Sequence, residues 1–440
     1  MSRVLSADWV LPVEGPPIEG GAVAIQDGRI AAVGRASDLG SGTHYPDAVI
    51  VPGFVNAHTH LEYAVYGGFG DGLADFADWI TLHIQRKGRI GWEQYVDVAR
   101  LGAAQCLQSG VTTVGDCSYS GATAVACADL GLRAVVYLEV FGADPAPALE
   151  HFAETREHVD SFFSDRVRPG ISPHAPYSVS LDLYRACAEL GLPTATHISE
   201  SPAEITYLVN GEGPWGAYTD LLVPHPGTTG TRLLAGHDLL GPDVIAAHCV
   251  MVEDDEIELL AATGTGVAHC PRSNAALGCG VAPLAELRAA GVKIGIGTDS
   301  PASAPSFDFF EELRSVILSA RARARRPSVL SAAAALELGT LGGARALGLD
   351  TEVGALSEGR RADLAVISLA GSSYVPVEDP AAAVVFGGSP GCVVATYVDG
   401  ELRYEKGGTD WHELTAAAHS ARRAMLAVPP AARPVAAPRA

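Results

Sequence analysis

Hydrophobic residues in the middle of the chain form short continuous runs, each ending in polar residues and followed by a segment of helical periodicity. Eight such runs occur, at 49–60, 112–118, 133–141, 167–177, 193–200, 244–250, 266–271 and 293–300. Near-continuous apolar runs are typical of parallel strands that are buried on both faces. Eight strand–helix units predict an α/β fold, a (β/α)8 barrel of the TIM type, whose active site gathers at the carboxyl ends of the strands.

The two ends of the chain show a different pattern, with short strands and tight turns. Asp27-Gly28 and Asp399-Gly400 each separate two apolar runs, which is typical of a β-hairpin. We expect both flanks to pair into one small β-sandwich. The predicted domains are a composite sandwich of residues 1–52 and 346–410, a hydrolase barrel over 53–345, and a C-terminal segment 411–440 with a helix and a Pro/Ala-rich tail expected to be disordered.

Composition and charge narrow the possible functions. The chain has 440 residues, 48% hydrophobic and 18% charged, which is too apolar for a disordered protein. Its net charge of −21 would repel phosphate backbones and anionic lipid, so neither a nucleic-acid nor a membrane partner is expected. The uncharged stretch 380–398 contains glycines and prolines that indicate a turn between two short strands. Eight irregularly spaced cysteines predict reduced thiols in a cytoplasmic protein.

Many of the histidines and two acidic residues fall where the predicted strands end. They are His58 and His60 at the first strand, His174 at the fourth, His197 and Glu200 at the fifth, His248 at the sixth, His269 at the seventh and Asp299 at the eighth. A His-x-His pair on a strand places both imidazoles on one face. Alone, such a pair is more often structural, but His197 and Asp299 complete a nitrogen and oxygen set that suits Zn²⁺ or Fe²⁺. We expect one divalent ion per subunit, because no lysine lies at a strand end where it could bridge a second.

Three of these residues are expected to handle protons. Glu200 follows His197 at a strand-to-helix turn and could protonate a ring nitrogen and then the departing amine; the alternative is an acid that stabilises the helix dipole. His248 is placed to help deprotonate the attacking water, the alternatives being a fifth ligand or a structural histidine. Asp299 can both bind the metal and accept the proton of the water.

Five motifs in this order resemble the amidohydrolase superfamily, and more narrowly its cytosine-deaminase and chlorohydrolase branch. They are PGFVNAHTH at 52–60, THISE at 196–200, AHC at 247–249, HCPRSN at 269–274 and GTDS at 297–300. The resemblance implies a mononuclear zinc or iron hydrolase acting on C–N bonds, with a flanking β-sandwich. It implies His58, His60, His197 and Asp299 as ligands and Glu200 and His248 as proton-handling residues. It also implies that homodimers are common among such proteins.

Two further segments resemble deaminases of adenosine derivatives. SPHAPYS at 172–178 is similar to their fourth strand, which implies that His174 contacts the substrate. HTHLEY at 58–63 is similar to a loop of aminodeoxyfutalosine deaminases. Glu62 would then accept hydrogen bonds from ribose hydroxyls or an amine, with a buttressing role as the alternative.

The residues from 61 to about 91 form a long insert beside the predicted barrel mouth, a position typical of lids and specificity elements. Trp79 could stack on a heterocycle there, and Arg86 could meet a substrate carboxylate. The alternatives are a loop anchor for Trp79 and a solvated cation for Arg86. Asn274 is expected to support a turn or to touch the substrate.

The sequence therefore predicts a metal-dependent hydrolytic deaminase of an adenine-type nucleoside derivative, such as aminodeoxyfutalosine. Metal-bound hydroxide would attack the amine-bearing ring carbon and ammonia would leave. The first alternative is another ring aminohydrolase or chlorohydrolase of the branch, acting on a pterin, guanine, cytosine or triazine. The second is a catalytically inactive binding or assembly protein on the same fold.

Overall fold

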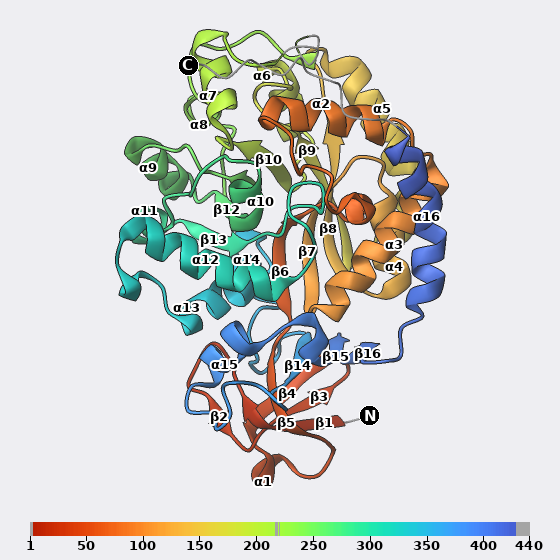
Figure 1. Ribbon diagram of the computed structural model, residues 1–440, viewed down its shortest axis with the longest axis vertical. Helices are drawn as coiled ribbons and strands as arrows, with labels where there is room; N and C mark the ends of the chain where they lie inside the picture. The colour runs from red at the N-terminus through yellow and green to blue at the C-terminus, as the bar shows by residue number, and fades with distance from the viewer. Residues whose placement is uncertain (1–2, 216–218, 220, 428–440) are drawn as a thin grey trace.

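A computed structural model describes residues 3–215, 219 and 221–427. The predicted strands close into a parallel barrel, in which β13 pairs with β6 through Ile296 and Asn56 (Figure 1). The barrel strands are β6 (Phe54–Thr59), β7 (Val111–Ser118), β8 (Arg133–Val140), β9 (Val167–Pro173), β10 (Thr194–Ile198), β11 (Val244–His248), β12 (Gly266–His269) and β13 (Lys293–Ile296). Every residue of β7 and β8 is buried, because such strands are covered on both faces. The predicted (β/α)8 barrel is confirmed.

Helices follow each barrel strand and cover the outside of the barrel. They are α2 (Phe76–Lys87), α3 (Trp92–Gln108), α4 (Ala122–Leu130), α5 (Pro145–Val159), α6 (Leu181–Ala188), α7 (Pro202–Asn210), α8 (Gly230–Ala235), α9 (Asp254–Thr263), α10 (Pro271–Ala276), α11 (Leu284–Ala289) and α12 (Phe309–Ala324). Ser180, Ser201 and Thr229 begin α6, α7 and α8 as N-caps, since each side chain accepts a backbone N–H of the first turn. Two short helices follow α12 in the chain: α13 (Ala332–Glu337), which packs on α12, and α14 (Gly343–Ala346), which packs on β6 and β13.

Both ends of the chain contribute to a second, mixed sheet below the barrel in Figure 1. Its strands are β1 (Arg3–Val10), β2 (Ile18–Glu19), β3 (Gly21–Gln26), β4 (Arg29–Arg35), β5 (Thr43–Pro52), β14 (Leu364–Ser368), β15 (Val393–Val398) and β16 (Glu401–Glu405). The antiparallel pair β5–β14 joins the N-terminal strands to the C-terminal ones. Side chains from both groups, such as Leu5 and Tyr397, share one core. The predicted composite β-sandwich is therefore confirmed.

The structure differs from the predicted strands at two places. The run 49–60 contains two strands, because β5 ends and β6 begins around Gly53, where a Cβ would lie only 2.1 Å from the Thr112 hydroxyl. The expected pair of strands over 380–398 is wrong, since the first half is helix α15 (Pro380–Gly387) and only the second half is a strand, β15. Asp379 caps α15 and Pro380 begins it, which is a helix-start signal in the sequence.

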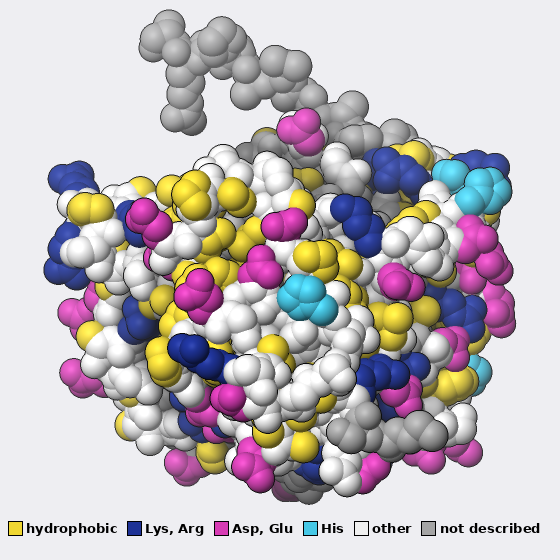
Figure 2. All heavy atoms as spheres, turned by 90° about the horizontal axis from the view of Figure 1, so that it is seen from below, with side chains coloured by type: hydrophobic (Ala, Val, Ile, Leu, Met, Phe, Trp, Pro, Cys, Tyr) yellow, Lys and Arg dark blue, Asp and Glu magenta, His cyan; other side chains and the backbone are white. Residues whose placement is uncertain are grey.

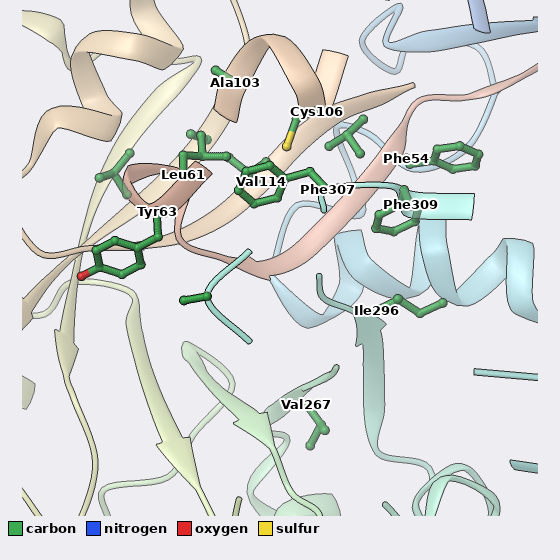
Figure 3. Close-up of a cluster of buried hydrophobic side chains, with 14 of the residues drawn as sticks. Phe54, Leu61, Tyr63, Ala103, Cys106, Val114, Val267, Ile296, Phe307 and Phe309 are labelled. Carbon is green, nitrogen blue, oxygen red and sulfur yellow. The ribbon is translucent and has the colours of Figure 1, made fainter. Parts of the chain in front are cut away.

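Aromatic packing and one buried ion-pair network hold the lower end of the barrel. The Phe54 ring stacks on Phe309 at 5.1 Å and meets Phe310 edge-on at 5.3 Å, within the core that Figure 3 shows. The buried Arg133 guanidinium donates to Asp363 at 2.8 Å and to Asp399 at 2.6 Å. This pairing joins the first residue of β8 to the terminal sheet.

Helix α16 (Trp411–Leu426) packs on α3 and follows the side of the barrel, and Arg422 donates to the Val65 carbonyl of the insert. The tail predicted to be disordered, 428–440, lies outside the described residues. Over the described ranges, none of the helices combines the length and the apolar character needed to cross a bilayer. The eight cysteines are unpaired. In Figure 2 acidic and basic side chains are interspersed over the face that it shows.

Candidate metal centre and active site

The candidate metal ligands lie at the carboxyl ends of the barrel strands. His58 lies on β6 and His60 directly follows it, so both imidazoles point into the barrel, with ring centroids 5.0 Å apart. The ring of His197, on β10, lies 4.9 Å from that of His58 and 5.5 Å from that of His60. The three imidazoles therefore face one point at the barrel mouth.

Asp299 reaches the same point because the chain after β13 continues alongside β6. Its backbone N–H donates to the His58 carbonyl at 3.0 Å, and Thr59 forms a parallel bridge with it. Its Oδ1 lies 3.8 Å from His58 Nε2 and 3.6 Å from His60 Nε2. The backbone at Asp299 has φ 55°, a left-handed conformation that non-glycine residues rarely adopt and that is often found at functional sites.

Hydrogen bonds at the outer nitrogens orient these histidines. His60 Nδ1 donates to the Cys117 carbonyl at 2.7 Å, and His197 Nδ1 donates to the His174 carbonyl at 2.8 Å. A histidine that donates through Nδ1 carries its lone pair on Nε2, which is the usual arrangement of a metal ligand. The inner nitrogens of both residues are thus available to a cation.

The histidine cluster fits a divalent metal ion. The ligand atoms of His58, His60 and His197 lie within 4.8 Å of one another. His58 Nε2 is buried and has no hydrogen-bond partner among the described residues, which a metal bond would explain. Burial lowers the pKa of His58 well below its usual range and, with the neighbouring His60, lowers the pKa of His197 to about 3. Neutral imidazoles with convergent lone pairs are what Zn²⁺ or Fe²⁺ requires.

Asp299 adds an oxygen ligand with a negative charge. Ser273 and Ser303 donate to its Oδ2 at 2.7 and 2.6 Å, which leaves Oδ1 for a cation. Burial by itself raises the pKa of Asp299, but His60, His248 and the two hydroxyls lower it overall. The residue is therefore a carboxylate.

Glu200 and His248 face the same point from two other strand ends. Glu200 Oε1 lies 3.6 Å from His248 Nε2, and ligand atoms of both residues and Asp299 lie within 4.8 Å of one another. Burial, and secondarily the charge of Asp299, raises the pKa of Glu200 well above its usual range. Burial lowers the pKa of His248, whose Nδ1 donates to Asn274 Oδ1 at 2.9 Å. These shifts favour the acid form of Glu200 and the neutral form of His248.

Glu204 holds the turn that carries Glu200, a role that the sequence analysis missed. Its carboxylate accepts the backbone N–H groups of Ser199 at 2.8 Å and Glu200 at 2.7 Å. Ser201-x-x-Glu204 is a capping-box sequence that could have drawn attention to it. Ser201 does accept the Glu204 N–H, but the glutamate contributes to the active-site turn instead of closing the box.

A second group of possible ligands lies beside the first. Ligand atoms of Glu139, His174 and His197 lie within 4.8 Å of one another. This group shares His197 with the first cluster, so the two do not form independent sites. The arrangement is compatible with a single metal ion.

A cavity of about 480 Å³ opens above the metal-ligand cluster. His60, His197, Glu200, His248 and Asp299 form its floor, and its walls are largely apolar and aromatic. The main wall residues are Tyr63, Phe76, Trp79, Ile80, Ile84, Tyr119, Phe141, Tyr177, Leu221, Leu222 and Val223. This size and lining are typical of sites for small organic molecules.

Two of the five predicted substrate contacts, Trp79 and His174, line the cavity. The Trp79 indole donates to the Ala302 carbonyl at 2.8 Å, which anchors the insert to the strand-eight loop. His174 Nδ1 lies 2.7 Å from the Ser178 hydroxyl, which leaves Nε2 for a ligand. Their substrate contacts stay predictions.

The other three, Glu62, Arg86 and Asn274, lie outside the cavity lining. Glu62 is fully buried and accepts hydrogen bonds from residues 118–120, which matches the buttressing alternative. The Arg86 guanidinium lies 4.7 Å from the Phe69 ring centroid. Asn274 orients His248 by accepting the hydrogen bond from its Nδ1.

Among the charged and imidazole side chains that line the cavity, three were not proposed from the sequence: His83, Lys87 and Glu139. His83 lies on α2, and its ring stacks on Trp79 in the cavity wall. Lys87 ends helix α2 and Glu139 lies on β8. Their meeting depends on how the insert folds over the barrel, which no local sequence pattern encodes.

Comparison with known proteins supports one family. The model of the Amidohydrolase family matches residues 49–403. A protein of Symbiobacterium thermophilum named 5-methylthioadenosine/S-adenosylhomocysteine deaminase is 33% identical over 420 residues, covering 91% of this chain and 93% of the relative. A 5'-deoxyadenosine deaminase of Methanothermobacter thermautotrophicus is 30% identical over 403 residues, covering 89% and 90%.

Among solved structures, an adenosine deaminase from Xanthomonas campestris with bound zinc is similar throughout. Its TM-score is 0.85 at 28% identity, and the match covers 97% of this chain and 98% of that one. The barrel, the terminal sheet and the positions of the strand ends therefore have a close structural counterpart.

Proposed function

The chain belongs to the amidohydrolase family, and we propose that it deaminates the adenine ring of a nucleoside derivative by hydrolysis with one divalent metal ion. The observation that supports this proposal most strongly is that His58, His60, His197 and Asp299 converge on one point, which Glu200 and His248 also face. The names of the relatives support an adenine nucleoside as the substrate.

The metal would be held by the three imidazoles and the aspartate. When bound, such an ion supplies the Lewis acidity that makes water nucleophilic at neutral pH. Zinc is supported by the solved relative that contains it, and iron suits the same donors.

Glu200 and His248 would move the protons. Burial raises the pKa of Glu200, which favours the acid form, and this acid would donate its proton to a ring nitrogen. Protonation lets the ring accept electron density when water attacks the amine-bearing carbon. His248, kept neutral and oriented by Asn274, accepts a hydrogen bond from the attacking water. Glu200 would then take up one proton of the water and deliver it to the departing ammonia, while Asp299 would accept the second as the hydroxyl becomes the ring carbonyl and return it to Glu200.

The cavity walls would position the nucleoside. His174 Nε2 is placed to bind a nitrogen of the purine, and Trp79 offers a ring face to the heterocycle. Within this class we propose a 5'-modified adenosine, with aminodeoxyfutalosine as the specific candidate from the motif at 58–63. The apolar walls support a substrate with a bulky substituent rather than a free base.

A substrate panel tests this proposal. The metal-loaded protein is incubated with 5'-deoxyadenosine, 5'-methylthioadenosine, S-adenosylhomocysteine, aminodeoxyfutalosine, guanine, cytosine, a pterin and a chlorotriazine, and ammonia and chloride are measured. We expect ammonia from the adenine nucleosides together with the hypoxanthine products. Chloride release, or ammonia from the other rings alone, would contradict the proposal.

A further inference from the structure

Two oppositely charged side chains line the cavity above its metal-ligand floor. Lys87 is the last residue of α2, and Glu139 lies on β8. Among the described residues, no carboxylate oxygen lies within 4.0 Å of the Lys87 ammonium. The chain has a net charge of −21 and three lysines, and one of these lysines, Lys87, lines the ligand cavity.

Aromatic rings hold the Lys87 ammonium in place. It lies 3.9 Å from the centroid of the Tyr119 ring and 4.9 Å from that of Phe141. Cation–π contacts stabilise the charge without using its N–H donors. Burial lowers the pKa of Lys87, while Glu139 and Glu62 oppose that effect. The ammonium can therefore donate to a ligand.

Glu139 is the second charged group of the cavity for which no described residue supplies a hydrogen bond or an ion pair. It is 7% exposed, and no described residue donates a hydrogen bond to its carboxylate. A buried carboxylate normally has donors, so a ligand is expected to supply them. The ligand atoms of Glu139, His174 and His197 lie within 4.8 Å of one another, so the carboxylate borders the metal-ligand floor of the cavity.

We propose that Lys87 forms an anion subsite, and that the preferred substrate is an adenine nucleoside whose 5' substituent carries a carboxylate. Glu139 accepts hydrogen bonds from the sugar hydroxyls, between this subsite and the reacting ring. A carboxylate fits better than a phosphate, because a dianion would face one cation next to the charge of Glu139. This inference rests on the proposed deaminase function and extends it to substrate choice.

A matched pair of nucleosides tests the subsite: 5'-S-(2-carboxyethyl)-5'-thioadenosine and its primary carboxamide. They differ in charge but hardly in shape. For the metal-loaded wild type we expect kcat/KM to be about tenfold or more higher for the acid, as a hydrogen bond to a charged group provides. Lys87→Met should remove most of this preference through KM, whereas Lys87→Arg should keep part of it.

Two further variants separate charge from structure. Lys406→Met removes a lysine that donates to the Gly391 carbonyl on the exterior of the terminal sheet, and it should leave the acid-to-amide ratio as in the wild type. Glu139→Gln should raise KM for both nucleosides alike, because their sugars are identical. The affinities of the acid and the amide for the Glu200→Gln protein, measured by calorimetry, compare the two nucleosides without turnover.

The possible failures are distinguishable. Equal kcat/KM values for acid and amide in the wild type, or equal losses for both in Lys87→Met, would overturn the anion subsite while deamination stands. If neither compound nor 5'-methylthioadenosine releases ammonia, the proposed function fails. The calorimetric comparison then still decides whether Lys87 prefers the acid.

Discussion

Replacing Glu200 by glutamine removes the proposed proton donor and almost nothing else. The side chain is 4% exposed, and no described residue donates a hydrogen bond to its carboxyl group. Glutamine has the same shape, so the loss of folding stability should be small. The nitrogen and oxygen donors of the metal cluster are untouched.

The expected effect on catalysis follows from the loss of general acid–base chemistry. Such a group contributes about 10²–10⁴-fold to the rate, or about 3–5 kcal/mol of the activation barrier. Because Glu200 would serve both the ring nitrogen and the leaving ammonia, we expect the upper part of this range. The assay follows conversion of 5'-methylthioadenosine by its absorbance change and by released ammonia, with metal content measured on the same sample.

A matched control is Glu256→Gln, which changes a fully buried glutamate on α9, away from the cavity. It should keep kcat near the wild-type value, whatever it costs in stability. A Glu200→Gln protein that retains its metal and turns over within about threefold of the wild type would refute the proton-transfer role.

Three other predictions concern the metal, the fold and the pH response. His60→Ala should lose the metal by elemental analysis, whereas the exposed His151→Ala should keep it; full occupancy in His60→Ala would count against the ligand set. Arg133→Met leaves the buried Asp363 without its cation, whereas Asp399 keeps Arg166, and the free energy of unfolding should fall by about 3–5 kcal/mol in denaturant titrations, against about 0–1 for the half-buried Arg100→Met; equal losses would contradict this. Because burial raises the pKa of Glu200 and the acid form is active, kcat/KM should fall as pH rises through that pKa; a rate still rising far into alkaline pH would argue against the acid role.

The barrel could be predicted because its strands are buried on both faces and so appear as continuous apolar runs. The rim residues followed from the same pattern, since parallel strands end at one edge. The junction at Gly53 could not be read in this way, because the two strands beside it are equally apolar yet belong to different sheets. Helix α15 was missed although its Asp379-Pro380 start was visible in the sequence.

The floor of the site could be predicted further than its walls. The ligand candidates are tied to strand ends, whereas Lys87 and Glu139 meet through the packing of the insert on the barrel. Lys87 was considered only as a possible bridging lysine and was set aside because it does not lie at the carboxyl end of a predicted strand. Arg86, one residue earlier on α2, was proposed for a substrate carboxylate but lies outside the cavity lining. Successive side chains on a helix point about 100° apart. The sequence alone does not show which of the two neighbours faces the cavity.

Anomalous diffraction from crystals of the metal-loaded protein, recorded on both sides of the metal absorption edge, tests the central claim most directly. The account predicts one peak per chain, within bonding distance of His58 Nε2, His60 Nε2, His197 Nε2 and Asp299 Oδ1. A peak bound by Glu139 and His174 instead, a second peak there, or none at the His58–His60 pair would contradict it.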